Sequence, residues 1–518
     1  MEPVIPGVNR SRPGRKVGPA LPLLVSVLFL SAGCGTLRQE PDQSILTREE
    51  RRFADALAHY AQGLIHQKEL DENAPEAFES FKRAAELDPD NYALHSAVGM
   101  LARHQEEPDV KTALAHYTKA IELAPTRSLL YIALAELHFH QKQDEAALEV
   151  LRTGLEKARS RTLILAGAYR YVRMFIADRS VERAVKCLEF LANHSEQPRR
   201  YHHLLGHLYI GLDNREQAIH HYTMAAEAEK PLAESFIALA GLYAEDQPAE
   251  AIATLIRGSE RVPDNPHILF ALAQFYSAED KFDEAIAIFA KIKNLIQDVQ
   301  QQTLTAEVYL QYGATCERAR RHEEAEKIFE ECIELHPDAH RVLNYLAYMW
   351  AEEGVNLDKA HAYVTRALAL KSGDGAYLDT LGWIYYKQKR YRLALKMIQK
   401  AAEAIPDDPV ICDHMGDVYR ELGEHEDAIK YWSQSYRLDS TSKTVEAKLS
   451  KHGVNLEKLR KEGEELKKAA EAKRKKEEEA ESVLHGEPPP AEEPPAATVP
   501  PPADTNAPPF LQPPTDNP

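Results

Sequence analysis

Small and large apolar positions alternate in a fixed rhythm along most of the chain. Alanines recur in phrases such as Glu76-Ala77-Phe78, with successive spacings of 36, 34, 37, 34, 33, 34, 40, 35, 34 and 34. The series is Ala77, Ala113, Ala147, Ala184, Ala218, Ala251, Ala285, Ala325, Ala360, Ala394 and Ala428. Another small residue, such as Gly63 or Gly206, stands twelve or so positions before most of these alanines, and a large apolar residue stands four positions after each. Such a regular period indicates one repeated supersecondary unit.

The spacing predicts two antiparallel helices in each repeat. Small residues let two helix backbones approach where they cross, and a large residue four positions later fills the space beside the crossing. Proline follows the second helix in several repeats, as at Pro89 and Pro337, because it cannot continue a helix. One hairpin cannot bury both of its faces. We therefore expect an all-α solenoid of about eleven stacked hairpins over residues 49–440.

The repeat resembles the tetratricopeptide repeat over roughly residues 53–440. The resemblance is most specific in 201–230 and 377–439, where Thr380-Leu381-Gly382-Trp383-Ile384-Tyr385-Tyr386 and His414-Met415-Gly416-Asp417-Val418-Tyr419 stand close to the family pattern. It is weaker in 161–196, where the small residue of the first helix is unclear. The widest step, from Ala285 to Ala325, predicts a longer helix or loop within 291–303.

Residues 1–48 predict an export signal and a tether. Basic residues precede the apolar run 21–30, which is too short to span a bilayer but has the length of a signal-peptide core. The run ends in Ser31-Ala32-Gly33-Cys34, which resembles the lipobox of bacterial lipoproteins. This resemblance implies cleavage after residue 33, lipid on the Cys34 sulfur and a lipidated tether over 34–48. An ordinary secretory signal with an incidental cysteine is the alternative.

The same resemblance carries an expectation about location. Gly35, rather than aspartate, follows Cys34, as in lipoproteins that are sent on to the outer membrane. We therefore expect a lipid-anchored protein of the cell envelope, on the outer membrane and facing the periplasm.

Two segments follow the repeats. Residues 441–484 are predicted to form a capping helix over about 441–451 and then an exposed helix rich in Lys, Glu and Ala, without a sustained heptad pattern. Residues 485–518 include thirteen prolines. Such a segment cannot bury a core and is predicted to be a disordered tail.

Composition narrows the classes of function. The formal net charge of -18 disfavours binding to nucleic acid and to anionic lipid headgroups. No phosphate-binding loop, hydrolase elbow, zinc-protease motif or dinucleotide fingerprint occurs in the sequence. We therefore expect no enzymatic activity and no cofactor.

Histidines and cysteines offer two weaker candidates. His203 and His207 lie four positions apart on one helical face, near other histidines, and such a pair can share a metal. No third ligand is evident, so hydrogen-bonding histidines on a groove wall are the preferred interpretation. Cys316 and Cys332 fall in the two helices of one hairpin, where buried thiols are favoured and a disulfide stays open.

The tetratricopeptide resemblance also implies a binding surface, because that family binds peptides mainly with first-helix residues on its concave face. The corresponding positions here are His203 and His207 in one repeat and, in the last three, Asn344, Tyr348, Asp379, Trp383, Tyr386, Asp413, Asp417 and Arg420. Aromatic rings beside carboxylates suit an extended peptide with apolar and basic residues. The alternative is that Tyr348 and Trp383 only pack between neighbouring helices.

Three functions follow as hypotheses. The first is a membrane-anchored scaffold of the bacterial envelope that holds partner proteins or peptides in its concave groove. The second is a subunit of a polysaccharide or cell-wall export or assembly complex. The third is a metal-binding carrier that uses the histidine cluster. The oligomeric state stays open.

Overall fold

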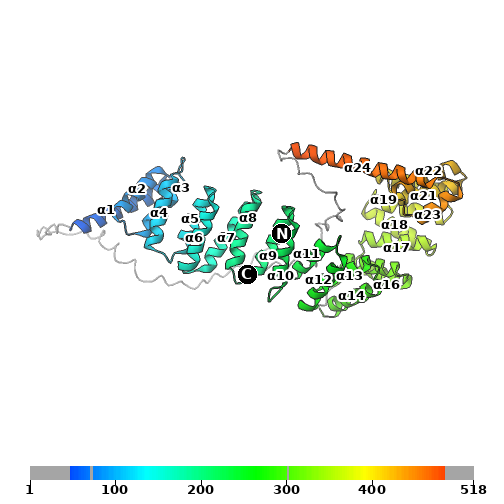
Figure 1. The fold of residues 1–518 in the computed structure, drawn as a ribbon, viewed down its shortest axis with the longest axis horizontal. Helices are drawn as coiled ribbons and strands as arrows, with labels where there is room; N and C mark the ends of the chain where they lie inside the picture. Colours follow the sequence, from blue (N-terminus) through cyan, green and yellow to red (C-terminus); the bar gives the residue numbers. More distant parts are fainter. Residues whose placement is uncertain (1–46, 71–73, 300–302, 485–518) are drawn as a thin grey trace, which may run out of the picture. The chain divides into compact units, whose positions relative to one another are not determined.

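The computed structural model describes residues 47–70, 74–299 and 303–484. Within these ranges it contains 24 α-helices and one π-helix, and no strand (Figure 1). The all-α prediction is therefore confirmed. Its helices form two compact units, which meet in sequence between Arg161 and Thr162. The predicted signal peptide, Cys34 and the Pro-rich tail 485–518 lie outside the described residues.

The first unit contains three helical hairpins. Each pairs a first helix with the next one along the chain, as the blue to cyan ribbon of Figure 1 shows. The helices are α1 (Arg48–Glu69), α2 (Pro75–Leu87), α3 (Tyr92–Arg103), α4 (Val110–Leu123), α5 (Ser128–His140) and α6 (Asp144–Lys157).

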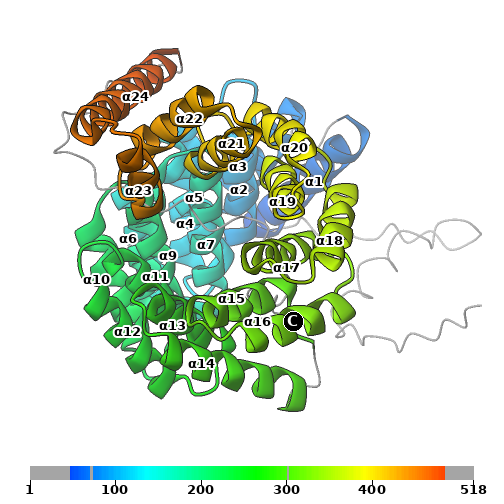
Figure 2. The ribbon, with the colours of Figure 1, turned by 90° about the vertical axis from the view of Figure 1, so that its right-hand side faces the viewer.

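The second unit contains eight consecutive pairs of helices and two further helices, which agrees with the expected array of about eleven hairpins. The hairpin helices are α7 (Arg161–Ala177), α8 (Val181–His194), α9 (Pro198–Gly211), α10 (Arg215–Ala226), α11 (Ala233–Tyr243), α12 (Pro248–Arg261), α13 (Pro266–Ala278), α14 (Phe282–Asn294), α15 (Ala306–Arg318), α16 (His322–Leu335), α17 (His340–Glu353), α18 (Leu357–Leu370), α19 (Gly375–Lys387), α20 (Tyr391–Ala404), α21 (Pro409–Leu422) and α22 (His425–Leu438). In Figure 2 they follow an arc, with first helices α17 and α19 on its inner side and second helices α18 and α20 on its outer side.

The repeated positions form the core. Every alanine of the series is 0 or 1% exposed, and the large residue four positions after each is also buried. The small residue of the first helix faces that large residue across the hairpin. At Gly206, for example, a Cβ would stand 2.6 Å from the ring of Tyr222. Burial at the helix crossing therefore explains why the sequence keeps this rhythm.

Two departures from the rhythm have local causes. After α14 the chain continues as the π-helix η1 (Leu295–Val299), so the widest step lengthens a helix as predicted. The added turn is packed into the core through Ile296, which is fully buried. In α7, Val172 occupies the crossing position and is buried, which explains why no small residue was evident there.

The last two helices are α23 (Lys443–Lys451) and α24 (Leu456–Leu484). The capping helix is present, since Val445 and Leu449 of α23 pack against Trp432 of α22. The expectation of a fully exposed charged helix is wrong for the start of α24. Leu459 is buried in the same cluster, and Arg437 of α22 bonds Glu462 at 2.6 Å.

No helix within the described ranges is both long enough and apolar enough to cross a membrane.

Candidate binding surface on the last first helices

The predicted groove residues occupy equivalent places on three successive first helices. Asn344 and Tyr348 stand on α17, Asp379, Trp383 and Tyr386 on α19, and Asp413, Asp417 and Arg420 on α21. In each helix one member lies three positions before the small crossing residue and another lies one position after it. Tyr386 and Arg420 lie three positions further along α19 and α21, so the eight side chains share the same face of neighbouring helices.

Trp383 lies at the centre of an aromatic stack. Its ring packs on Tyr386 with centroids 4.5 Å apart and on His414 of α21 with centroids 4.0 Å apart. The indole is only 6% exposed. Packing between neighbouring first helices is therefore correct for the ring of Trp383. Sequence reasoning missed His414 because it lies one position away from the residues that the family pattern marks.

A buried ion pair holds His414 in this stack. Its Nδ1 lies 2.9 Å from a carboxylate oxygen of Asp379 on α19. Burial alone would lower the pKa of His414, but the negative charge of Asp379 and its hydrogen bond raise that pKa above the ordinary 6.5. The bond between His414 and the Asp379 carboxylate therefore joins α19 to α21.

The acidic pair on α21 is also engaged within the chain. Lys448 of the capping helix α23 donates to Asp413 at 2.6 Å and to Asp417 at 2.8 Å. Trp432 Nε1 donates to Asp417 at 3.1 Å. Burial raises the pKa of Asp413 despite the nearby lysine. These two carboxylates are thus bound to the chain's own cation, which the sequence pattern did not reveal.

Arg420 has partners of the same kind. Its guanidinium donates to the Tyr386 hydroxyl at 2.9 Å and to Glu421 at 2.8 Å. Burial raises the pKa of Tyr386 to about 12, so this tyrosine stays neutral and hydrogen-bonded. The α21 end of the predicted surface is therefore a closed polar network.

The α17 and α19 part of the surface is different. Among the described residues, Asn344 Oδ1 and Trp383 Nε1 are buried side-chain atoms without a hydrogen-bond partner. Tyr348, half-buried on α17, has its pKa raised by burial and by the carboxylates of Glu352 and Asp379. A buried acceptor, a buried donor and a tyrosine hydroxyl thus lie on two adjacent first helices. The Tyr348 hydroxyl is hydrogen-bonded to Glu352, but the Asn344 and Trp383 atoms are unpaired. Burying an unpaired polar atom is costly, and a ligand that pairs it recovers that cost.

The histidine candidates form two pairs. His203 Nε2 lies 3.1 Å from His207 Nε2, and His203 Nδ1 lies 2.9 Å from the Ser235 hydroxyl. His202 and His221 pair through their Nδ1 atoms at 3.1 Å. Burial, with the neighbouring His207, lowers the pKa of His203 to about 4. Within the described part of the chain, no group of three or more potential ligands could hold a metal ion.

The two cysteines of the α15–α16 hairpin are buried free thiols. Burial raises the pKa of Cys316 and of Cys332 to about 12 in each case. Both side chains are fully enclosed in the core of the second unit. The structure therefore agrees with buried apolar cysteines rather than a disulfide.

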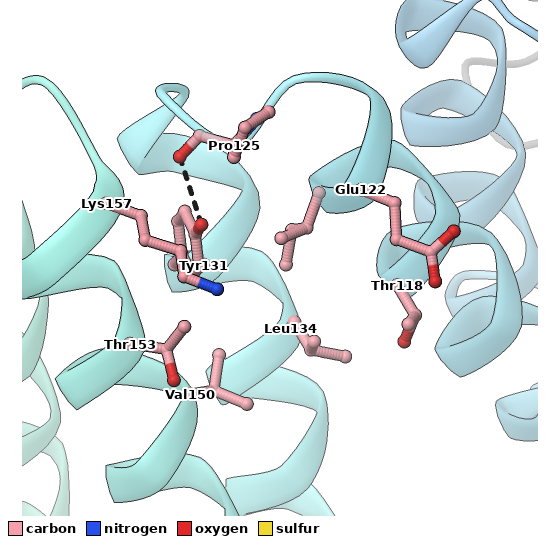
Figure 3. A pocket seen from close by; sticks show the side chains of 9 residues that line it. Thr118, Glu122, Pro125, Tyr131, Leu134, Val150, Thr153 and Lys157 are labelled. Carbon is pink, nitrogen blue, oxygen red and sulfur yellow. Dashed lines mark hydrogen bonds between the residues drawn. The ribbon is translucent and has the colours of Figure 1, made fainter.

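The first unit contains a separate recess of about 500 Å³ between α4, α5 and α6 (Figure 3). It is lined by Thr118, Ile121, Glu122, Pro125, Tyr131, Leu134, Val150, Thr153 and Lys157. The Tyr131 hydroxyl donates to the Pro125 carbonyl at 3.0 Å, so its polar end is satisfied. None of the predicted site residues lies here.

Sequence profiles of the tetratricopeptide repeat match residues 104–168, 266–338 and 317–375, and a further profile matches 376–408 and 410–442. These matches confirm tetratricopeptide repeats in both units. The predicted surface residues Asn344 to Arg420 lie within the matched ranges. The second unit therefore presents them on a tetratricopeptide scaffold, a fold that serves protein interaction.

Individual relatives match over limited lengths. A tetratricopeptide repeat-containing protein of Pseudomonas aeruginosa is 32% identical over 92 residues, which is 18% of this chain and 15% of the relative. The crystal structure of yeast Tom70 is similar at 16% identity, with a TM-score of 0.35, over 78% of this chain and 95% of that chain. YrrB, whose structure is described as a TPR protein with an unusual peptide-binding site, has 19% identity and a TM-score of 0.30, over 37% of this chain and 95% of its own.

Proposed function

We propose that this protein is a membrane-anchored scaffold of the bacterial envelope. In this proposal, lipid on Cys34 fixes the chain to the outer membrane, facing the periplasm. The concave surface of the last repeats holds an extended segment of a partner protein, and the chain itself carries out no reaction.

The observation that carries the binding proposal is that two of the three unpaired buried atoms on α17 and α19 belong to the predicted surface, whereas the third, Trp350 Nε1, lies in the core. Asn344 Oδ1 accepts and Trp383 Nε1 donates, and neither has a partner among the described residues. The backbone of an extended peptide offers N–H donors and C=O acceptors along its length. Both atoms are shielded from solvent in the free chain, so in this proposal the two side chains turn toward the partner when it binds and its backbone then pairs them.

The bonds that Asp413 and Asp417 of α21 already make within the chain limit where a partner can bind. Asp413 and Asp417 are already bound by Lys448, so we place the partner over α17 and α19 and not over α21. Charge recognition of a basic partner then falls to Glu352, which lies beside Tyr348 on α17.

Site-specific photocrosslinking in cells tests this placement. A photoreactive amino acid replaces Tyr348 in one variant and Lys400, exposed on the outer helix α20, in the matched control. We expect a defined adduct from position 348 that position 400 does not give. Equal adducts at both positions, or none at 348, would contradict binding at this surface.

The anchor is tested separately. The sequence 31–34 supports it, so we expect the wild-type chain to incorporate labelled acyl chains and to fractionate with membranes. The Cys34→Ala variant should do neither. Acylation that persists in Cys34→Ala would refute the assignment of the lipid to this sulfur, without bearing on the groove.

No described feature favours the export-complex alternative over a general scaffold. The metal-carrier alternative has two paired histidines but lacks a third ligand among the described residues.

A further inference from the structure

Helix α1, the first described helix of the first unit, exposes an apolar face among the described residues. Within that unit α2 to α6 all lie on one side of α1 (Figure 1). The exposed face has two neighbouring rows of side chains. The large row is Phe53, Leu57, Tyr60 and Leu64, and the small row is Ala54, Ala58 and Ala61 with Ile65 at its end. Phe53 is 63% exposed and Ile65 is 50% exposed.

The other first helices show what the small row of this face is for, whereas Ala93 and Met100 of α3, at the places of Leu57 and Leu64, are exposed. Each first helix uses one face against its own second helix and another against the preceding hairpin. Leu94 and Leu101 of α3 occupy the places of Ala58 and Ile65 in the next repeat, and both are buried in the core shared with α2. In α1 the first face is used, since Gly63 packs on Phe81. The second face has no described hairpin to cover it.

The spacing of the rows indicates a helix as the occupant. Both rows follow steps of four, three and four positions, which is the seam that one helix presents to another helix. The alanines of the small row leave room for a close approach of the two backbones. An extended segment needs no such spacing.

Charge at the two ends of the face selects the partner and its direction. Glu50 and Lys68 are separated by about five whole helical turns, so both stand at the same angle on the helix. A second α1 in antiparallel orientation places Glu50 opposite Lys68 of the partner subunit, twice by symmetry. A parallel arrangement places like charges together, which is unfavourable.

The same register fits the side chains. It brings Leu57 level with Ala61 of the partner subunit and Leu64 level with Ala54 of the partner subunit. Apart from Phe53, which stands level with Ile65 of the partner subunit, large residues therefore stand at the level of small ones along the seam. We propose that two copies of this chain associate through an antiparallel pairing of their α1 helices, centred near Ala58.

Disulfide crosslinking of the full-length chain in membranes tests this pairing. In the antiparallel register, Ala58→Cys lies next to its symmetry mate, whereas Ala54→Cys lies far from its own. We therefore expect a disulfide-linked dimer from Ala58→Cys and none from Ala54→Cys alone. The described native cysteines, Cys187, Cys316, Cys332 and Cys412, are buried and leave the test undisturbed. The wild-type chain controls for any crosslink through Cys34.

A charge variant provides the second arm. Lys68→Glu should lower the dimer yield of the Ala58→Cys chain several-fold, while Lys111→Glu, exposed on α4, should leave it unchanged. Circular dichroism checks that the helices remain folded.

Several results would overturn the pairing. Crosslinks from both cysteines indicate a parallel dimer. If Ala58→Cys gives no crosslink and its thiol is protected from maleimide, another segment covers the face. If it gives no crosslink and the thiol reacts with maleimide, the face is free.

Discussion

Because Gly206 packs closely against Tyr222, the structure predicts whether Gly206→Ala raises or lowers stability. In Gly206→Ala the new methyl group would stand 2.6, 2.7 and 2.8 Å from three atoms of the Tyr222 ring. Carbon atoms in contact prefer about 3.5 Å or more, so the ring must move by about 1 Å. Tyr222 is only 2% exposed, so the ring is enclosed by its neighbours.

Two opposing effects determine how much Gly206→Ala changes the free energy of unfolding. Overpacking of a filled core costs about 1–3 kcal/mol. Alanine in place of glycine within a helix recovers up to about 1 kcal/mol. We therefore expect Gly206→Ala to lower the free energy of unfolding by about 1–2 kcal/mol.

Gly241 provides the matched control. It also lies inside a first helix, but a Cβ there meets no atom within 4 Å. Only the helix-propensity term remains, so Gly241→Ala should stabilise α11 by roughly 0.5–1 kcal/mol. The same substitution in neighbouring hairpins is thus expected to have opposite signs.

Native-state hydrogen exchange read by mass spectrometry is the suitable assay, because solenoid stability is local and set by nearest neighbours. Each ~1.4 kcal/mol changes the protection factor about tenfold. Protection of α9 and α10 should fall several-fold to thirtyfold in Gly206→Ala, and protection of α11 should rise in Gly241→Ala. Increased protection in both variants would refute the packing argument.

Three further predictions concern charge. Because Asp379 raises the pKa of His414, the stability from this pair is fully present below pH 6.5 and is lost as pH rises through the higher folded pKa. Asp379→Asn should therefore be more destabilising at pH 6 than at pH 9 in urea titrations followed by tryptophan fluorescence; an equal loss at both values would count against the pair. Burial lowers the pKa of His203 to about 4, so the free energy of unfolding should fall as pH drops from 6.5 toward 4. In His203→Gln the unfolding midpoint should therefore drop less between pH 7 and pH 5 than it does in the wild-type chain. Lys448→Met leaves Asp413 and Asp417 without their cation, so it should lower the free energy of unfolding by about 2 kcal/mol and make α23 more sensitive to protease. Lys451 is exposed on the same helix, and Lys451→Met should have neither effect.

The repeat architecture was predictable from the sequence because its cause is local and recurs. Each alanine at a helix crossing needs a large residue four positions later, so the pattern from Ala77 to Trp432 reports the hairpins directly. The same logic assigned the eight predicted surface residues to three successive first helices, since equivalent positions in a repeat stack beside one another, and their part in binding is still a prediction.

The partners of those residues were not predictable in this way. Lys448 reaches Asp413 and Asp417 only because α23 folds back over the last hairpin, and no periodic signal marks that contact. His414 pairs with Asp379 on the preceding first helix, a contact between distant parts of the chain. The start of α24 was expected to be exposed because its few leucines show no heptad, yet the buried Leu459 and the bond from Arg437 to Glu462 attach it to α22.

The proposed function depends on Asn344 and Trp383 being held unpaired for a partner. The most direct measurement compares Asn344→Leu with the wild-type chain for two properties, the unfolding midpoint and the yield of the adduct from the photoreactive residue at position 348. Removal of a buried unpaired amide should leave stability equal or higher, because the leucine needs no hydrogen bond, while the partner loses one. We predict an unchanged or raised midpoint with a strongly reduced adduct, and Lys400→Met on α20 should change neither. An undiminished adduct in Asn344→Leu would contradict the claim.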